Sequence, residues 1–248
     1  MLTYSMTPVD IFNSILQDRE KINYWLNKSE SKIIKLFGKQ FKYPKYHSEN
    51  YKHPKSGIDY MLLFIKQNQE SKLETKVIAK SILENKKYFI DFGFGYNIDK
   101  EKKCCTAAPV LNIFDGHFFE RYKERCLKNE SLQIDDVIGK YYSRLTRLNL
   151  LEINNGIIND WKEKYGEFST VFYTNDGICL GRRSICQPPN IKVEQGKANE
   201  VAVNEYKTFI SADMLSDKQK DSIKEEGLKY YDRYIEHIHD LYKIGGLI

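Results

Sequence analysis

The sequence feature that most constrains the fold is a hairpin signature in the last third of the chain. Two runs rich in β-branched and aromatic residues, 167–174 and 178–185, are joined by Asn175-Asp176-Gly177. Asn-Gly and Asp-Gly pairs supply the positive φ angles that tight hairpin loops need. Because the two strands of a hairpin pair antiparallel, we expect this segment to lie in a mainly antiparallel sheet.

Further strand signals stand on both sides of this hairpin, as short β-branched and aromatic runs bounded by turn-forming residues. The predicted strands are residues 60–65, 75–83, 87–94, 109–114 and 205–211. The polar stretch 84–87 would make a second hairpin of two of them. We predict loops where the chain is polar or charged, at residues 39–57, 96–104 and 187–204.

Apolar residues at helical spacing mark the remaining elements. Thr7 and Pro8 predict a helix start, because Thr is a favoured N-cap and Pro a favoured first helical residue. A second short helix is expected to end at Gly38. The predicted helices are residues 8–26, a second from 29 or 31 to 37, and then 116–128, 133–148 and 216–242.

This order of elements predicts an α+β fold. Runs of strands and runs of helices favour a mainly antiparallel sheet with two consecutive helices packed on it. A helical N-terminal extension and a long C-terminal helix complete the expected architecture. The expected segments, which together fit one compact domain, are a helical part with a basic loop (1–56), a β-rich part (57–107), an α+β core (108–215) and the C-terminal helix (216–248).

The composition is ordinary for a globular chain and excludes several classes of protein. Of 248 residues, 41% are hydrophobic, and the net charge of +5 is compatible with an anionic partner. Five cysteines without a CxxC pair argue against a disulfide framework or a zinc site, so we expect reduced thiols, no metal and no cofactor. The chain shows no signal peptide and no apolar run of the ~20 residues that span a bilayer, so we expect a cytoplasmic protein without membrane contact.

The most informative functional pattern lies on one predicted helix. His117, Arg121 and Arg125 follow one another at steps of four, so all three can share one flank. An imidazole and two guanidinium groups near a helix start suit phosphate binding, because the helix N-terminus adds unpaired N–H groups and partial positive charge. The same spacing is typical of surface ion pairs with neighbouring carboxylates, so the helix alone leaves both interpretations open.

Two further candidate sets carry positive charge. Arg182 and Arg183 are adjacent on a predicted strand and point to opposite faces, so at most one can face a site shared with the helix. The predicted loop 39–57 is the most basic stretch of the chain, and its tyrosines offer stacking surfaces for nucleic acid. The candidate nucleic-acid-binding residues there are Lys39, Lys42, Tyr43, Lys45, Tyr46 and Lys52. Surface solubility and a solvated linker are the alternative interpretations of these two sets.

The order of these pieces resembles a known group of proteins. A strand leads into the H-x3-R-x3-R helix, a second helix carries an apolar core, a hairpin turns at Asp-Gly, and a last strand carries Thr-Phe. The residues concerned are His117, Arg121, Arg125, Ile134, Val137, Ile138, Asp176, Gly177, Thr208 and Phe209. They resemble the small bacterial RelE-related domains with a strand–helix motif of roughly HAxxRxxxRG, which are similar to the barnase–EndoU–colicin–RelE group of metal-independent RNases. The likeness covers about residues 108–212, and Phe118 and Cys126 stand where that motif has small residues.

The resemblance implies a toxin-type endoribonuclease, a hydrolase that acts on RNA. Attack of a 2′-OH on the adjacent phosphate needs a base, an acid and cations at the phosphoryl oxygens. His117 would then transfer protons, Arg121, Arg125, Arg182 or Arg183 would stabilise the charge, and Thr208 would donate a hydrogen bond. No metal is required.

Two other functions fit the same sequence. One is a nucleic-acid-binding module without catalysis, with phosphate contacts from the basic loop and the arginine helix. The other is a phage or mobile-element protein with a structural or interaction role, which would bind a protein partner through the C-terminal helix 216–242. That helix has one apolar stripe, so packing on its own domain is the alternative for it.

Overall fold

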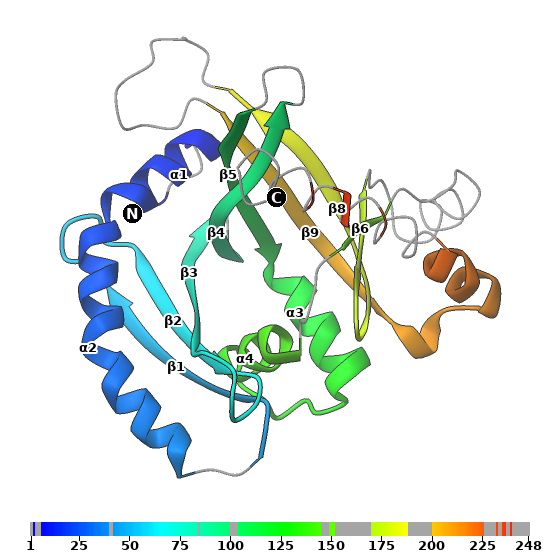
Figure 1. Cartoon of the computed structure of the whole chain (residues 1–248), viewed down its shortest axis with the longest axis horizontal. Coiled ribbons are helices and arrows are strands. Elements are labelled where there is room, and N and C mark those ends of the chain that lie inside the picture. The colour runs from blue at the N-terminus through cyan, green and yellow to red at the C-terminus, as the bar shows by residue number, and fades with distance from the viewer. Residues whose placement is uncertain are drawn as a thin grey trace.

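One continuous sheet runs through the structure, which is a computed structural model (Figure 1). The described residues are 2, 6–39, 42–83, 85–99, 104–144, 149–151, 170–187, 200–225, 232, 235, 236 and 239. Within them, nine strands form a single sheet in the order β1-β2-β3-β4-β5-β9-β8-β7-β6. Neighbouring strands are antiparallel except β5 and β9, which run parallel. The α+β class and the mainly antiparallel sheet are therefore confirmed.

The elements have the following bounds. The strands are β1 (Lys45–Lys52), β2 (Asp59–Lys66), β3 (Glu74–Leu83), β4 (Lys86–Asp99), β5 (Cys104–Asp115), β6 (Asn149–Leu151), β7 (Thr170–Thr174), β8 (Gly177–Cys186) and β9 (Val201–Ser211). The helices are α1 (Pro8–Gln17), α2 (Arg19–Gly38), α3 (Gly116–Tyr122) and α4 (Ile134–Arg144), with a π-helical turn η1 (Lys123–Leu127) after α3 and a 3-10 turn η2 (Ala212–Met214) after β9.

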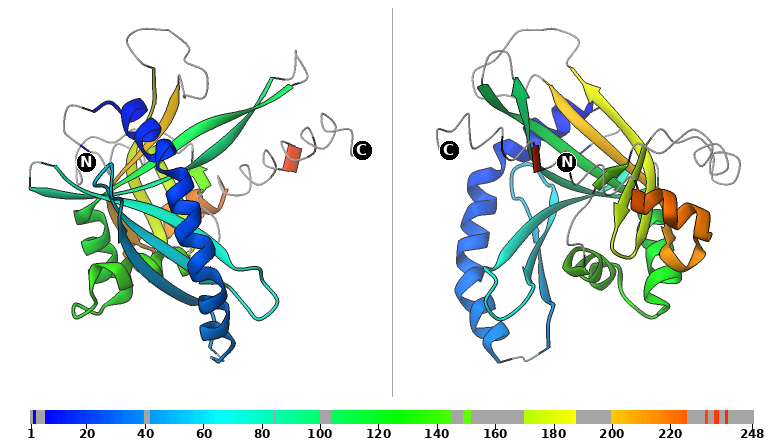
Figure 2. Two further views of the ribbon diagram at one scale, coloured as in Figure 1. Left: turned by 90° about the vertical axis from the view of Figure 1, so that its left-hand side faces the viewer. Right: turned by 45° about the vertical axis from the view of Figure 1, so that its right-hand side comes forward.

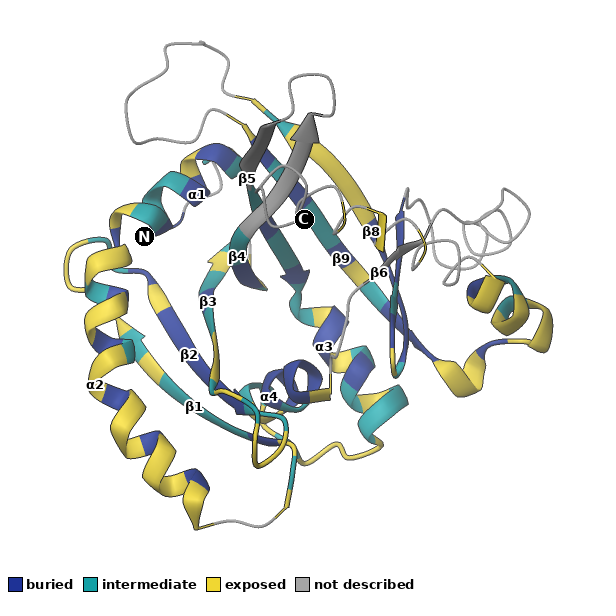
Figure 3. Cartoon of the chain, viewed as in Figure 1, coloured by how far each residue is buried: buried dark blue, intermediate teal, exposed yellow. Residues whose placement is uncertain are grey.

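Helices lie on both faces of this sheet (Figure 2). Residues of α1 and α2 are buried together with strand residues such as Tyr60 and Leu62, which defines the α1/α2 face. Residues of α3 and α4 are buried with Met61 and Leu63, which defines the α3/α4 face. Residues 60–65 of strand β2 are thus an unbroken apolar run because alternate side chains enter two different cores. Figure 3 shows it buried along nearly its whole length.

The N-terminal helices begin as the sequence predicts but divide differently. Thr7 caps α1 in a reciprocal capping box with Asp10, and Pro8 is the first helical residue. The helix predicted to start at residue 29 or 31 instead begins at Arg19 and continues to Gly38. Asp18 forms the break between α1 and α2, and the residue is only 5% exposed.

A buried polar cluster explains why an aspartate occupies that break. Tyr60 donates a hydrogen bond to Asp18 (2.8 Å), Ser56 donates a second, and His53 Nδ1 lies 3.2 Å from Asp18 Oδ1. Burial, together with the hydrogen bond to Asp18, raises the pKa of the Tyr60 phenol, so this hydroxyl remains a donor. The cluster fixes the α1–α2 junction to the loop between β1 and β2.

Removing this carboxylate is expected to destabilise the protein strongly. Asp18→Ala leaves the buried hydroxyl donor of Tyr60 without its acceptor and removes the bond from Ser56, so the free energy of unfolding should fall by about 3 kcal/mol. Urea unfolding measures this loss. Asp18→Asn keeps one acceptor oxygen and should lose less; equal losses for both variants would show that the hydrogen bonds do not hold the junction.

Several predicted boundaries are wrong, and the reason is pairing between distant segments. Residues 45–52, predicted as loop, form β1 because they pair along their length with β2. The predicted loop 96–104 likewise contains the last residues of β4 and the first residue of β5, and the predicted loop 187–204 contains the start of β9. The helix predicted for 116–128 changes to π-helical geometry at Lys123, and the helix predicted for 133–148 spans Ile134–Arg144 in the described residues.

The two predicted hairpins and the C-terminal segment have different outcomes. Strands β3 and β4 pair around residues 84–85, and β7 and β8 pair around Asn175 and Asp176, so both hairpins are confirmed. Most of the predicted helix 216–242 lies outside the described residues, which show helix at 217–225. There Leu215 and Ile223 are buried against β7, β8 and β9 residues, so this part packs on its own domain.

Candidate functional site

Helix α3 is held rigidly against the α3/α4 face. Phe118, Phe119 and Tyr122 are fully buried in the core of that face. The Tyr122 hydroxyl donates to Asp176 in the β7–β8 turn (2.6 Å), and Arg144 of α4 donates to the same carboxylate (2.6 Å). One carboxylate therefore ties α3, α4 and the hairpin together.

The opposite flank of α3 carries the histidine and the first arginine of the motif. Arg121 Nε donates to His117 Nε2 (3.1 Å), and Arg121 Nη1 lies 2.7 Å from Glu124 Oε2. The two side chains are 49% and 36% exposed. Asp115 caps the helix by accepting from the backbone N–H of His117 (3.0 Å). The structure thus brings His117 and Arg121 into direct contact on an exposed surface.

Arg125, the last residue of the H-x3-R-x3-R motif, points toward β9, whereas His117 and Arg121 contact each other. Its guanidinium donates to the main-chain carbonyl of Phe209 on β9. This bond anchors the end of α3 and η1 to the last strand. Arg125 therefore serves to fix the helix, whereas His117 and Arg121 lie where a ligand can reach them.

Thr208 and Arg182 lie on the other face of the sheet. Thr208 is directly opposite Leu180, which is buried on the side away from α3. Directly opposite strand residues share a face. A β-bulge between Leu180 and Gly181 lets Tyr206 and Phe209 both face α3, and so turns Thr208 away. The expectation that Thr208 shares a cleft with His117 is corrected by this register shift.

Arg183 belongs to a polar row that crosses four strands of the α3/α4 face. Asp91, Asn112, Asn204 and Arg183 are directly opposite one another on β4, β5, β9 and β8. Asn112 Oδ1 accepts from Asn204 Nδ2 (3.0 Å) and from the Tyr206 hydroxyl (3.2 Å). Asn204 Oδ1 is the buried side-chain atom without a hydrogen-bond partner in the part of the chain that the structure describes.

The surroundings of Asp91, the carboxylate of this row, shift its pKa. Burial raises the pKa of Asp91 above its ordinary value of 3.8, against the opposing effects of the Lys76 amino group 3.7 Å away and of hydrogen bonds from Tyr142 and Asn112. A carboxyl with a raised pKa binds its proton more tightly in the folded state. The contribution of such a carboxyl to the free energy of unfolding is therefore fully present below its ordinary pKa. That contribution is lost as pH rises through the raised pKa of the folded state.

This sign gives a testable pH dependence. We expect the free energy of unfolding of the wild type, minus that of Asp91→Asn, to decrease as pH rises from about 4 towards neutrality. Urea unfolding of both proteins at a series of pH values measures the difference. A difference that stays constant, or that increases with pH, would contradict a raised pKa at Asp91.

The predicted basic loop does not form one nucleic-acid track. Lys45 is 3% exposed, with its amino group bound to the Phe37 carbonyl and 3.9 Å from the centre of the Tyr43 ring. Tyr46 packs against Gly139 of α4. Lys39 and Lys42 are exposed near the start of β1, and the exposed Lys52 is at its far end, ~25 Å away for an eight-residue strand.

Sequence reasoning missed the cross-strand polar row and the Asp18 cluster. Their members are single polar residues scattered over the chain, and only strand register and helix packing bring them together. One signal was available: Asp91 and Asn112 are polar residues inside predicted strands that are otherwise mostly apolar, and a polar side chain that becomes buried requires a partner.

The described residues offer no metal centre and no membrane-spanning helix. They contain no group of three His, Cys, Asp or Glu side chains that could hold a metal ion. None of their helices is both long enough and apolar enough to span a bilayer. Comparisons with known proteins find no similar one: no protein-family model, no curated protein and no solved structure matches the chain.

Proposed function

We propose that this protein is an endoribonuclease that cleaves RNA without a metal ion, with His117 and Arg121 as the residues that touch the substrate. The observation that carries the proposal is the direct contact between these two side chains on the exposed flank of α3. A proton-transferring imidazole beside a guanidinium is the pair that phosphodiester cleavage needs.

The rigid support of α3 favours a chemical role for its exposed flank. Catalytic groups act best when their helix is fixed by packing and hydrogen bonds from other residues. Here Arg125 binds the Phe209 carbonyl and Tyr122 binds Asp176, so the helix cannot rotate freely. The order β5, α3, α4, hairpin and β9 also agrees with the order that the resemblance implies.

The proposed reaction forms one bond and breaks one. His117 removes the proton of a ribose 2′-OH, and the resulting oxygen attacks the adjacent phosphorus. The bond from phosphorus to the 5′-oxygen breaks, and that oxygen takes a proton from water, leaving a 2′,3′-cyclic phosphate and a 5′-hydroxyl. Arg121 moves its hydrogen bond from His117 Nε2 to a phosphoryl oxygen, which stabilises the charge and frees the nitrogen to accept a proton.

Incubating the protein with total RNA in the presence of EDTA tests the proposal. We expect fragments that end in 2′,3′-cyclic phosphate, identified by mass spectrometry. RNA that is bound but stays intact would instead indicate a nucleic-acid-binding module without catalysis. RNA that is neither bound nor cleaved would exclude both functions.

A further inference from the structure

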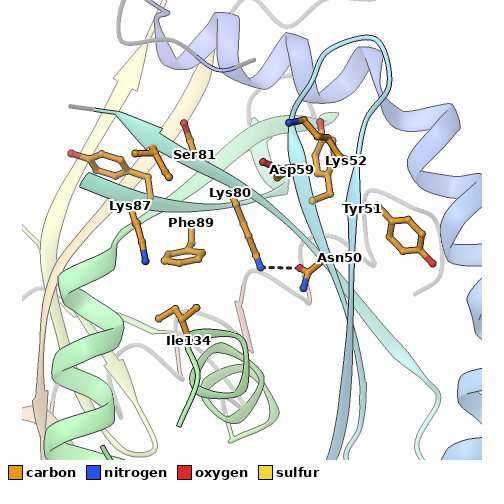
Figure 4. A pocket seen from close by; sticks show the side chains of 12 residues that line it. Asn50, Tyr51, Lys52, Asp59, Lys80, Ser81, Lys87, Phe89 and Ile134 are labelled. Carbon is orange, nitrogen blue, oxygen red and sulfur yellow. Dashed lines mark hydrogen bonds between the residues drawn. The ribbon is translucent and has the colours of Figure 1, made fainter. Parts of the chain in front are cut away.

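A hollow of about 490 Å³ opens on the α3/α4 face, at the edge of the sheet where α4 begins (Figure 4). Strands β1, β2, β3 and β4 line it, together with Ile134, the first residue of α4. Small-molecule pockets in proteins occupy roughly 300–1,000 Å³, so the hollow is large enough for one nucleotide. None of the residues discussed for α3 lines it.

Strand register decides which side chains enter the hollow. Lys80 is opposite Phe89, and Ile82 is opposite Lys87. Phe89 belongs to the core of the α3/α4 face, so the other three residues face the same side. Figure 4 shows the amino groups of Lys80 and Lys87 on either side of the Phe89 ring, with Ile134 across from them.

The two lysines differ in their surroundings. Lys80 Nζ donates to Asn50 Oδ1 (2.8 Å) and to Asp135 Oδ1 (2.7 Å), which fixes its position and offsets part of its charge. Lys87 is exposed, and no described residue forms an ion pair with it. An anionic group that enters the hollow beside Phe89 therefore meets Lys87 next to a positioned Lys80, and the exposed Lys52 of β1 lines the hollow at its other side.

The part of the hollow next to Lys87 is apolar, whereas Asn50, Lys52, Asp59 and Ser81 also line it. Ile82 is 70% exposed, a large apolar surface for one side chain, and Phe89 and Ile134 line the same hollow. A ligand that covers Ile82 gains the free energy of removing this surface from water. The complementary ligand thus combines a flat apolar part with an anionic group, which is the chemistry of a nucleotide.

We propose that this hollow binds one nucleotide of an RNA strand, with the base against Ile82 and Ile134 and the phosphate at Lys87. The start of α3 adjoins the hollow, because a Cβ added at Gly116 would lie 3.1 Å from the Lys87 carbonyl oxygen. The neighbouring nucleotide of the strand then reaches the helix that carries His117. The identity of the strand as RNA rests on the proposed function, whereas nucleotide binding is measured without any cleavage.

Calorimetric titration with AMP, adenosine and inorganic phosphate tests the proposal. We expect AMP to bind more tightly than adenosine or phosphate alone, and Lys87→Ala to weaken AMP binding about tenfold, the effect of losing a charged hydrogen bond. Lys86→Ala is the matched control, since the adjacent side chain on β4 points to the other face. Ile82→Ser should weaken AMP binding without changing that of phosphate.

The outcomes separate this inference from the proposed function. Equal effects of Lys86→Ala and Lys87→Ala, or equal affinity for AMP and phosphate, would overturn a nucleotide site in the hollow. AMP binding that depends on Lys87, while RNA stays intact, would support the nucleotide site and contradict the proposed RNA cleavage. RNA cleavage with the same KM in Lys86→Ala and Lys87→Ala would support the proposed RNA cleavage and contradict a nucleotide site in the hollow.

Discussion

His117→Ala is expected to reduce RNA cleavage by about 10²–10⁴-fold, the usual loss when a positioned acid–base group is removed. Arg121 would remain to bind phosphate, so binding of RNA should change far less than the cleavage rate. The His117 side chain is half exposed and its described contacts lie within α3, so the fold should persist. Initial rates with a fluorogenic RNA in EDTA measure the loss, and circular dichroism checks the fold.

His47→Ala supplies the matched histidine control. His47 is opposite Phe64, a residue of the α1/α2 core, so its imidazole lies on the other face of the sheet from α3. This variant should cleave RNA at the wild-type rate. Equal rates for His117→Ala and the wild type would remove His117 from the mechanism.

Gly181→Ala is expected to destabilise the protein by about 3 kcal/mol, near the upper end for overpacking a well-packed site. A Cβ at this position would lie 2.0 Å from the Glu205 carbonyl oxygen, which is main chain and cannot rotate away. Gly181 stands at the bulge where β8 and β9 shift register, so the clash acts on the central pairing of the sheet. Urea unfolding measures the change in free energy.

Gly93→Ala is the corresponding control on β4. A Cβ at Gly93 would meet nothing within 4 Å, so alanine fits without a clash. Because alanine also restricts the unfolded chain, the expected change is within about 1 kcal/mol and can be stabilising. Similar losses for both glycine variants would show that close approach to Glu205 is not what requires glycine at position 181.

Local chemistry predicted those elements whose signals lie within a few neighbouring residues. The helix start at Thr7 and Pro8 and the turn at Asn175 and Asp176 depend only on nearby backbone, and both occur where the sequence predicts them. Residues 60–65 are apolar throughout because they are buried on both faces, and they are also recognisable as a strand.

Long-range pairing determined what the sequence alone did not predict. Strand β1 consists of lysine, tyrosine and other polar residues, and it is a strand because β2 supplies eight paired positions. The face of Thr208 depends on a one-residue bulge, which no periodicity in β9 reveals. His117 and Arg121 were found because their contact is a step of four on one helix, whereas the hollow around Lys80 and Lys87 combines four strands and a helix.

Cleavage of an end-labelled oligoribonucleotide that carries one 2′-deoxy nucleotide tests the central claim most directly. If the 2′-OH attacks the adjacent phosphate, the bond on the 3′ side of the deoxy position should stay intact while the other bonds are cut in EDTA. The same bond should be cut when the ribonucleotide is restored. Cleavage at the deoxy position at an undiminished rate would contradict the proposed chemistry, and with it the role of His117 as the base.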